Sequence, residues 1–296
     1  MLGYKGAQNE SDIQSIGPNL KFTVFLKCMN RKTIYTILTI CCVVGFWLFD
    51  NFYTPATYSD TSGDGAKTVI ASSLMPSSTT GEIVEHSHFT LSYNEAYEQA
   101  EWVAYSLKKE HLTNDDRKRP YFIEDPKVRT KSADWRNYKG SGYDRGHLCP
   151  AGDRRFSEQA YNETFYTSNI SPQDRDFNAG IWNKLEKQVR IWAKRHGEIF
   201  VVTGGVLEEG LDEIGEEDVD VPEYYYKVIA RGDGDEIKML AFLLEGKERS
   251  KPLKQFSVSV DEVEKRTGID FFRKLPKKIQ DQKESEVDTG SWKFSF

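Results

Sequence analysis

The segment Ser141-Gly-Tyr-Asp-Arg-Gly-His-Leu148 is the most informative stretch of this chain of 296 residues. Two glycines flank charged residues within it, which predicts a tight segment with an accessible backbone and not a core strand. Asp144, Arg145 and His147 offer an orienting carboxylate, a cation for an anionic group and a base that titrates near neutrality. Taken alone, these residues also fit a surface loop with a structural histidine.

A second segment adds a helix to this loop. Residues 167–173 (TSNISPQ) form a polar loop, and Asp176-Phe-Asn178 leads into a predicted helix. Its apolar positions keep i, i+3/i+4 spacing: Ile181, Trp182, Leu185, Val189, Trp192 and Ala193. On a regular helix, Asn178 and Glu186 lie two turns apart and roughly 80° apart around the axis. Their oxygens can therefore address one hard divalent cation, although Asn178 also fits a helix cap.

Together the two segments resemble the DNA/RNA non-specific endonuclease family over about residues 93–272. The matching positions form an ordered set along the chain: Asp144–His147, Ser168–Gln173, Asn178, Trp182, Leu185, Glu186, Val202–Gly204, Val221–Pro222, Tyr226–Val228, Thr267–Gly268 and Phe271–Phe272. The resemblance implies the ββα-metal (His-Me finger) fold, in which two strands and a helix surround one cation. It also implies hydrolysis of DNA and RNA without base preference.

The resemblance gives the central residues their expected roles. His147 matches the general base that activates water, and Asn178 matches the direct ligand of Mg²⁺, with Mn²⁺ as the alternative metal. Glu186 matches the carboxylate that holds metal-bound water, while we take Asp144 as structural. The cation would stabilise the leaving 3′ oxygen, so that one product carries a 5′-phosphate.

Further polar residues are implied around this centre. Arg145 matches a catalytic residue beside the base, and Arg119 matches the phosphate-binding arginine, with Arg117 as its competitor. Asn169 matches a support of the metal site, and Gln173 a polar contact to substrate. The alternative from another class is a non-catalytic nucleic-acid-binding module with the same fold. A phosphodiesterase for another phosphate ester is a third interpretation.

Outside the motifs, the pattern predicts an α+β domain with a central, mainly antiparallel sheet. Glu198–Thr203 reads as a buried strand, and residues 224–230 and 238–244 read as a strand pair around a Gly-Asp turn. A helix capped by Asn94 is predicted through Leu107, and a short helix at Asp261–Arg266 is predicted to end at Gly268.

The N-terminal region contains an uncharged apolar run, residues 33–49, preceded by basic and followed by acidic residues. It predicts a signal anchor over residues 33–53, with residues 1–32 in the cytoplasm and the rest outside. A buried core helix is the alternative, and a cleavable signal peptide is disfavoured because no small-x-small site follows. Residues 1–28 also fit an upstream start-site artefact.

The remaining domain boundaries follow composition. Residues 54–82 are predicted to be a flexible linker, residues 83–276 the nuclease domain, and residues 277–296 a charged, frayed tail. The anchored domain would face the periplasm or cell exterior in a bacterium, or the mitochondrial intermembrane space in a eukaryote. We favour the bacterial location because no Arg- and Ser-rich transit peptide precedes the span. A homodimer is left open.

Charge and cysteine placement exclude some classes. The net charge of −6 argues against a protein that coats nucleic acid, yet residues 117–155 hold eleven Lys/Arg against five Asp/Glu. Residues 208–220 hold eight acids and no base, so a basic face is predicted on an otherwise acidic protein. Cys149 is the one cysteine of the soluble part, where a small buried residue is favoured over a nucleophile or metal ligand. Four histidines are expected at the surface or as caps: His86, His88, His111 and His196.

Overall fold

The computed structural model describes residues 30–53, 57–58, 74–79 and 81–295. The chain divides into two compact units, residues 1–54 and 55–296, and each is described by itself. Most of the predicted cytoplasmic tail, residues 1–29, lies outside the described residues, and so does most of the predicted linker.

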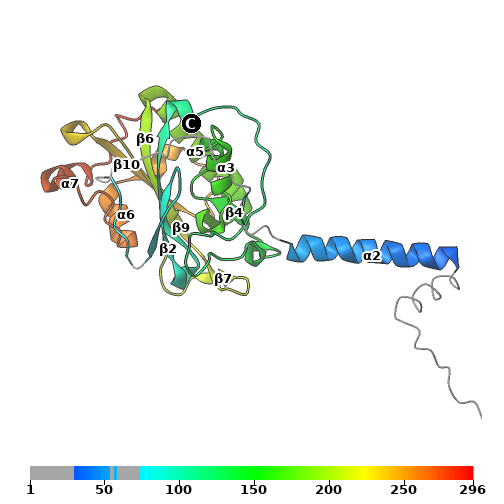
Figure 1. Cartoon of the computed structure of the whole chain (residues 1–296). Helices are drawn as coiled ribbons and strands as arrows, with labels where there is room; N and C mark the ends of the chain where they lie inside the picture. The colour runs from blue at the N-terminus through cyan, green and yellow to red at the C-terminus, as the bar shows by residue number, and fades with distance from the viewer. Residues whose placement is uncertain (1–29, 54–56, 59–73, 80, 296) are drawn as a thin grey trace, which may run out of the picture. The chain divides into compact units, whose positions relative to one another are not determined.

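The first unit contains one long helix, α2 (Arg31–Phe52), drawn in blue in Figure 1. The side chain of Asn30 caps it by accepting a hydrogen bond from the backbone N–H of Lys32 at 3.1 Å. The span Arg31–Phe49 is long and apolar enough to cross a membrane, and none of its most apolar window is buried. The alternative of a buried core helix is therefore wrong for this segment.

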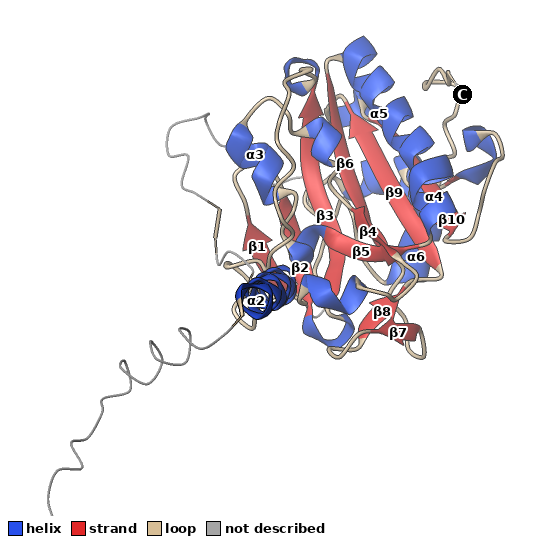
Figure 2. Ribbon diagram, turned by 90° about the vertical axis from the view of Figure 1, so that its right-hand side faces the viewer, coloured by secondary structure: helices blue, strands red, loops and turns tan. Residues whose placement is uncertain are grey.

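The second unit is built on a seven-stranded sheet in which every neighbouring pair is antiparallel. The strands are, in spatial order, β1 (Glu82–Glu85), β2 (Thr90–Asn94), β3 (Gln99–Lys108), β6 (Glu198–Gly205), β9 (Tyr224–Arg231), β10 (Lys238–Glu245) and β11 (Ser257–Val258). Figure 2 shows β3, β6 and β9 side by side. The predicted α+β class with a central antiparallel sheet is confirmed, as are the strands at β6, β9 and β10.

Two predicted elements are wrong. The polar loop expected at residues 167–173 is the turn η5 (Thr167–Asn169) followed by the buried strand β5 (Ile170–Gln173). The helix expected from Asn94 through Leu107 is strand β3, and Asn94 caps only a short turn before it. Residues 99–107 are all buried because β3 lies inside the sheet with packed layers on both faces. A strand that is buried on both faces carries apolar residues on both and loses a clear period-two alternation, so the helical spacing in this stretch is a coincidence.

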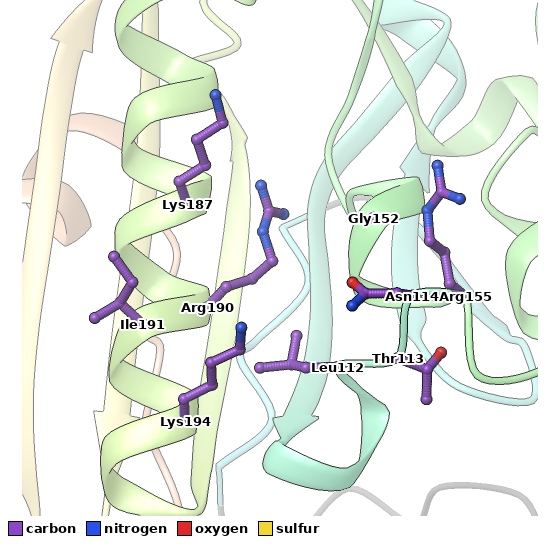
Figure 3. A pocket seen from close by; sticks show the side chains of 9 residues that line it. All are labelled: Leu112, Thr113, Asn114, Gly152, Arg155, Lys187, Arg190, Ile191 and Lys194. Carbon is purple, nitrogen blue, oxygen red and sulfur yellow. The ribbon is translucent and has the colours of Figure 1, made fainter. Parts of the chain in front are cut away.

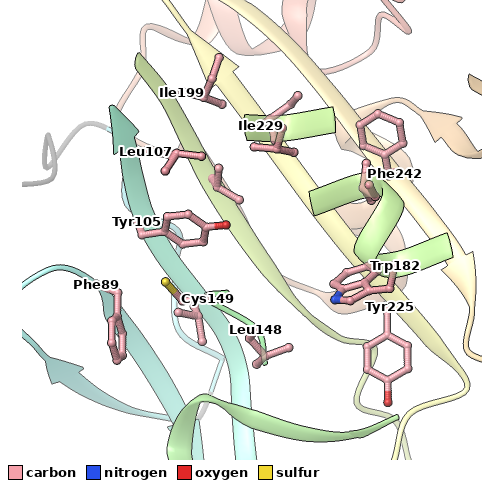
Figure 4. Packing of buried hydrophobic residues seen from close by; sticks show 14 of the residues in the cluster. Phe89, Tyr105, Leu107, Leu148, Cys149, Trp182, Ile199, Tyr225, Ile229 and Phe242 are labelled. Atoms are coloured by element: carbon pink, nitrogen blue, oxygen red, sulfur yellow. The ribbon is translucent and has the colours of Figure 1, made fainter. Parts of the chain in front are cut away.

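Each face of the sheet is covered by its own apolar cluster. On one face, Tyr105 and Leu107 of β3 pack with Leu185 and Trp192 of helix α5 (Asn183–His196), in the cluster shown in part in Figure 4. On the other face, the cluster includes residues of helix α6 (Val260–Thr267), which ends at Gly268 in the left-handed conformation as predicted. The sheet is thus a rigid middle layer on which the site is mounted.

The chain leaves the sheet after β3 and returns at β6. In between it forms a two-stranded ribbon of β4 (Asp144–His147) and β5 (Ile170–Gln173) and then a continuous helical segment. The other helices, turns and strands of the described residues are α3 (Glu158–Glu163), α4 (Arg175–Phe177), η6 (Asn178–Trp182), α7 (Lys277–Lys283), β7 (Asp212–Ile214), β8 (Val219–Val221), η1 (Glu95–Tyr97), η2 (Lys109–His111), η3 (Trp135–Tyr138), η4 (Ala151–Asp153), η5 (Thr167–Asn169), η7 (Gly234–Glu236) and η8 (Leu253–Phe256).

Both borders of the predicted domain differ from expectation. Before it, Leu74 and Met75 pack on the sheet, and Trp102 donates its indole N–H to the carbonyl of Ser77 at 2.7 Å. After it, the tail is not frayed: Trp292 is 1% exposed and stacks edge-to-face on Trp192. The charged composition of the last twenty residues hides this anchor in the sequence. A single aromatic side chain buries enough apolar area to hold a segment whose other residues are mostly charged.

Candidate active site

His147 is held at the end of strand β4. It pairs with Ile170 of β5, and the next residue, Leu148, donates its backbone N–H to the carbonyl of Asn169 at 2.9 Å. The imidazole packs against two aromatic rings, with centroid distances of 5.6 Å to Phe122 and 4.9 Å to Phe165. The ribbon therefore fixes the backbone and the rings fix the side chain.

The environment of His147 keeps the imidazole neutral. Nε2 is buried and has no hydrogen-bond partner among the described residues. Burial first, and the nearby guanidinium of Arg119 second, lower the pKa of His147 to about 3. A neutral imidazole at physiological pH has a lone pair ready to accept a proton.

Asn178 lies where the short helix α4 passes into the π-helical turn η6. Its Nδ2 donates to Oδ2 of Asp144 at 3.1 Å, across from strand β4 to the helix. Within the same turn, Gly180 adopts a non-helical conformation (φ −94°, ψ −106°). The amide nitrogen is thus occupied, and Oδ1 of Asn178 remains as the free acceptor.

A cleft of about 330 Å³ brings the predicted centre together. His147, Asn178, Glu186 and Arg190 all line it, so the strand and the helix contribute to one site. The angle of about 80° expected on a regular helix does not apply here, because the segment passes through a π-helical turn in which Gly180 is non-helical.

A buried charge network lies behind Glu186. Arg190 bonds Asp153 at 2.7 Å and lies 3.9 Å from Glu186, while Lys227, fully buried, donates to Oγ1 of Thr203 at 3.0 Å. Burial raises the pKa of Glu186 and lowers the pKa of Lys227, against the attraction of the surrounding opposite charges. Most of this network leaves no local signal in the sequence. The i, i+4 spacing of Glu186 and Arg190 is the one feature that indicates a pair within it.

Two arginines flank the aromatic wall beside His147. The guanidinium carbons of Arg119 and Arg145 lie 5.3 Å and 4.8 Å from the ring centroid of Phe122. Burial and the charge of Arg119 lower the pKa of Arg145. Two like charges held this close next to the predicted base suit an anion that binds both. Arg117 instead bonds the carbonyl of Arg155 and the carboxylate of Asp115.

Asn169 and Gln173 lie under the site and are both fully buried. Asn169 accepts the backbone N–H of Cys149 at 2.8 Å and donates to the carbonyls of Cys149 and Thr164 at 3.0 Å and 2.9 Å. It braces the chain just after the histidine and leaves neither amide atom for a ligand. The amide of Gln173 has no partner among the described residues and packs against Gly146, below the surface of the cleft.

The remaining cysteine and histidines are structural. Cys149 is fully buried, and burial raises the pKa of its thiol to about 12, in agreement with the predicted small core residue (Figure 4). His86, His88 and His111 are at most 9% exposed, so a surface position is wrong for all three, but His111 is a cap as the alternative expected: its Nδ1 accepts the backbone N–H of Lys108 at 3.3 Å. His86, for example, bonds Asp125 through Nε2 at 2.7 Å, a pairing 39 residues apart that no local pattern indicates.

Two antiparallel strands and a helix around a cleft, with His147 on the strand and Asn178 on the helix, form the ββα-metal architecture. A family profile described as DNA/RNA non-specific endonuclease matches residues 67–278. The chain belongs to this family. A solved structure entitled "Crystal structure of the EndoG/EndoGI complex: Mechanism of EndoG inhibition" has a TM-score of 0.62 and 31% identity, and covers 66% of this chain and 87% of that chain.

Characterised relatives have similar identities. "Nuclease EXOG, mitochondrial" from Mus musculus is 35% identical over 226 residues, which are 70% of this chain and 61% of the relative. "Nuclease C1" from Cunninghamella echinulata var. echinulata is 36% identical over 222 residues, 67% of this chain and 85% of the relative. The chain thus spans about 60% of the length of the EXOG relatives that it matches.

Proposed function

We propose that this protein is a metal-dependent endonuclease that hydrolyses phosphodiester bonds of DNA and RNA without base preference. The observation that carries the proposal is the cleft shared by His147, Asn178 and Glu186, with Arg119 and Arg145 beside the histidine. The family membership and the nuclease names of the relatives support the reaction class.

In this proposal His147 is the general base. Its neutral imidazole takes a proton from the attacking water, and the rings of Phe122 and Phe165 restrict its rotation. Arg119 and Arg145 bind the phosphate that is attacked. Both guanidinium groups lie over the ring of Phe122, which also packs against His147. A positioned base and a doubly bound phosphate bring the reacting atoms together before the chemical step.

The donor set fits a hard divalent cation, which we propose to be Mg²⁺, with Mn²⁺ as the alternative. Asn178 presents Oδ1 because its nitrogen is bonded to Asp144, and the carboxylate of Glu186 lines the same cleft. When bound, such a cation stabilises negative charge that develops on the phosphate and on the leaving 3′ oxygen. Asn178 would hold it directly, and Glu186 would hold its water.

Lack of base preference follows if the protein contacts phosphate and sugar alone, since base edges carry the sequence information. With the 3′ oxygen as leaving group, the phosphate stays on the 5′ oxygen of the downstream fragment, so the products are a 3′-hydroxyl and a 5′-phosphate. The same geometry without turnover would describe the alternative, a nucleic-acid-binding module.

The test is nicking of supercoiled plasmid and cleavage of a labelled RNA by the full chain in detergent, with and without Mg²⁺. His147→Ala and Asn178→Ala should each lower the rate by about 10²-fold or more. His196→Ala, which changes a histidine at the far end of α5, is the matched control and should cut normally. Binding without cutting by the wild type would support the non-catalytic module, and equal cutting by all variants would refute the mechanism.

We also propose that residues 33–53 anchor the protein in a membrane, with the nuclease domain on the side opposite the basic flank of α2. The mitochondrial names of the EXOG relatives favour the intermembrane space, in place of the bacterial exterior that the sequence alone favoured. Protease protection in intact and outer-membrane-ruptured mitochondria tests this. A domain accessible only after the inner membrane is opened would contradict it.

A further inference from the structure

A second hollow lies directly beside the cleft. It has a volume of about 460 Å³ and separates helix α5 from the segments that carry Asn114 and Arg155. Four of its lining residues are cationic: Arg155, Lys187, Arg190 and Lys194. Figure 3 shows Lys187, Arg190 and Lys194 extending from α5 on the side that faces Asn114 and Arg155. We call this hollow the basic groove.

The spacing on α5 makes the basic groove a row and not a random cluster. Lys187, Arg190 and Lys194 lie at i, i+3 and i+7, which places them on one face of the helix. Seven residues span a rise of roughly 10 Å, close to three base steps of about 3.4 Å along one strand. No carboxylate is among the residues that line the groove in the described part of the chain.

The carboxylates nearest to this row already have partners. Asp153 and Glu186 are engaged by Arg190, so their charge is largely compensated where the cleft and the groove meet. Lys187 and Lys194 are exposed, and no hydrogen bond or ion pair of either side chain is found among the described residues. The row therefore offers two exposed ammonium groups that no ion pair among the described residues holds, and such groups act on phosphates as point charges.

The basic groove is continuous with the cleft. Gly152 and Arg190 line both hollows, so a chain leaving the cleft can pass over this shared border without crossing another element. A polyanion that places one phosphate beside His147 thus has a basic path on the α5 side.

We propose that the basic groove binds the sugar–phosphate backbone of the strand being cut, beyond the scissile phosphate, through Lys187, Lys194 and Arg155. This rests on the proposed function, and it adds where the substrate lies and the expectation that long polymers bind better than short ones. The contacts are to phosphates, so they add affinity to every sequence equally.

The experiment compares substrates of two lengths. The double variant Lys187→Gln/Lys194→Gln is measured in the full chain with a 20-nucleotide and a tetranucleotide DNA at several salt concentrations. The matched control is Lys274→Gln/Lys278→Gln, which removes the same charge from an exposed segment on the other face of the sheet. Arg190 is left unchanged because it pairs with Asp153 and Glu186.

For the 20-nucleotide substrate, KM of the double variant should rise about tenfold while kcat stays within twofold. The slope of log K against log salt should fall by roughly 0.7 per lost contact on a single strand. The tetranucleotide, which spans fewer of these contacts, should show a clearly smaller rise in KM. Equal effects of the control pair, an unchanged KM, or equal losses on both substrates would each overturn the proposal.

Failure of the proposed function is distinguishable from failure of this inference. Fluorescence anisotropy with His147→Ala, with and without the lysine changes, measures binding of the 20-nucleotide strand independently of turnover. If no substrate is cut but the lysine pair still weakens binding about tenfold, the basic groove stands and the hydrolytic function falls.

Discussion

Asp144 and Asn178, 34 residues apart, are joined by a hydrogen bond of 3.1 Å that links strand β4 to the helical segment of the site. The sequence indicates a structural role for Asp144, and this bond shows what that role is: Asp144 holds the side chain of Asn178. It occupies the amide nitrogen of Asn178 and so turns the oxygen toward the cleft. An asparagine free to rotate would present nitrogen to a cation in half of its orientations.

Asp144→Ala should therefore weaken the response to metal more than the binding of substrate. We expect the Mg²⁺ concentration for half-maximal cleavage to rise about 10- to 100-fold, as for loss of a residue that orients a ligand. Arg175→Ala is the matched control, since Arg175 is the exposed partner of Asp144 at 3.5 Å and bonds Asn178 through its backbone carbonyl, which the substitution keeps. A wild-type metal dependence in Asp144→Ala would show that the bond does not orient Asn178.

Gly146 should be intolerant of any side chain. A Cβ at this position would overlap the side chain of Gln173, so Gly146→Ala should lower the free energy of unfolding by about 1–3 kcal/mol. Activity should fall as well, because Arg145 and His147 flank the displaced residue. Combining it with Gln173→Ala should recover much of the lost stability in a double-mutant cycle followed by thermal unfolding. Additive losses would mean that the overlap is relieved elsewhere.

The C-terminal tail should stabilise the catalytic helix. Trp292 stacks on Trp192 of α5 at a centroid distance of 5.1 Å, and Trp192 donates its indole N–H to the carbonyl of Lys293. Trp292→Ala should cost about 3–5 kcal/mol of stability and reduce cleavage near the unfolding temperature. Val287→Ala, at a residue 48% exposed, is the control and should be near neutral. Denaturant titration that separates the two variants by less than 1 kcal/mol would contradict this role.

Glu284 should make the protein less stable at alkaline pH. Its carboxylate is 5% exposed, Oε1 has no partner among the described residues, and burial and the nearby Asp261, Glu264 and Asp270 raise its pKa to about 8. Below the unfolded pKa, about 4.5, both states are protonated; between there and pH 8 the unfolded state ionises while the buried carboxyl of the folded state stays protonated, so stability falls across this window. Glu284→Gln should thus be stabilising by about 1–3 kcal/mol at pH 9 and near neutral at pH 4.5.

The matched control for this prediction is Glu286→Gln, at an exposed carboxylate two residues further along. Unfolding temperatures measured from pH 4.5 to 9 should diverge for Glu284→Gln alone. A constant difference across this range would show that folding does not raise the pKa of Glu284.

The sequence predicted those parts of the molecule whose signal is local. His147, Asn178 and Glu186 lie in motifs, and the structure places all three on one cleft. Strand β3 was missed because burial on both faces removes the alternation that reveals a strand. Arg190 with Asp153 was missed because the pair joins positions 37 residues apart, and spacing carries no record of such a contact.

The position of the ββα unit in the sheet has a consequence for folding kinetics. Strands β3 and β6 are neighbours at the centre of the sheet, with Lys108 opposite Glu198, and residues 109–197 lie between them. Strands β1, β2 and β3 form by short connections, but their junction to β6 requires closure of a loop that contains the whole site. Such non-local pairing slows folding. Substitutions in residues 109–197 will consequently alter the refolding rate as well as turnover. The yield of soluble protein will therefore differ among variants of the site, even in the absence of substrate.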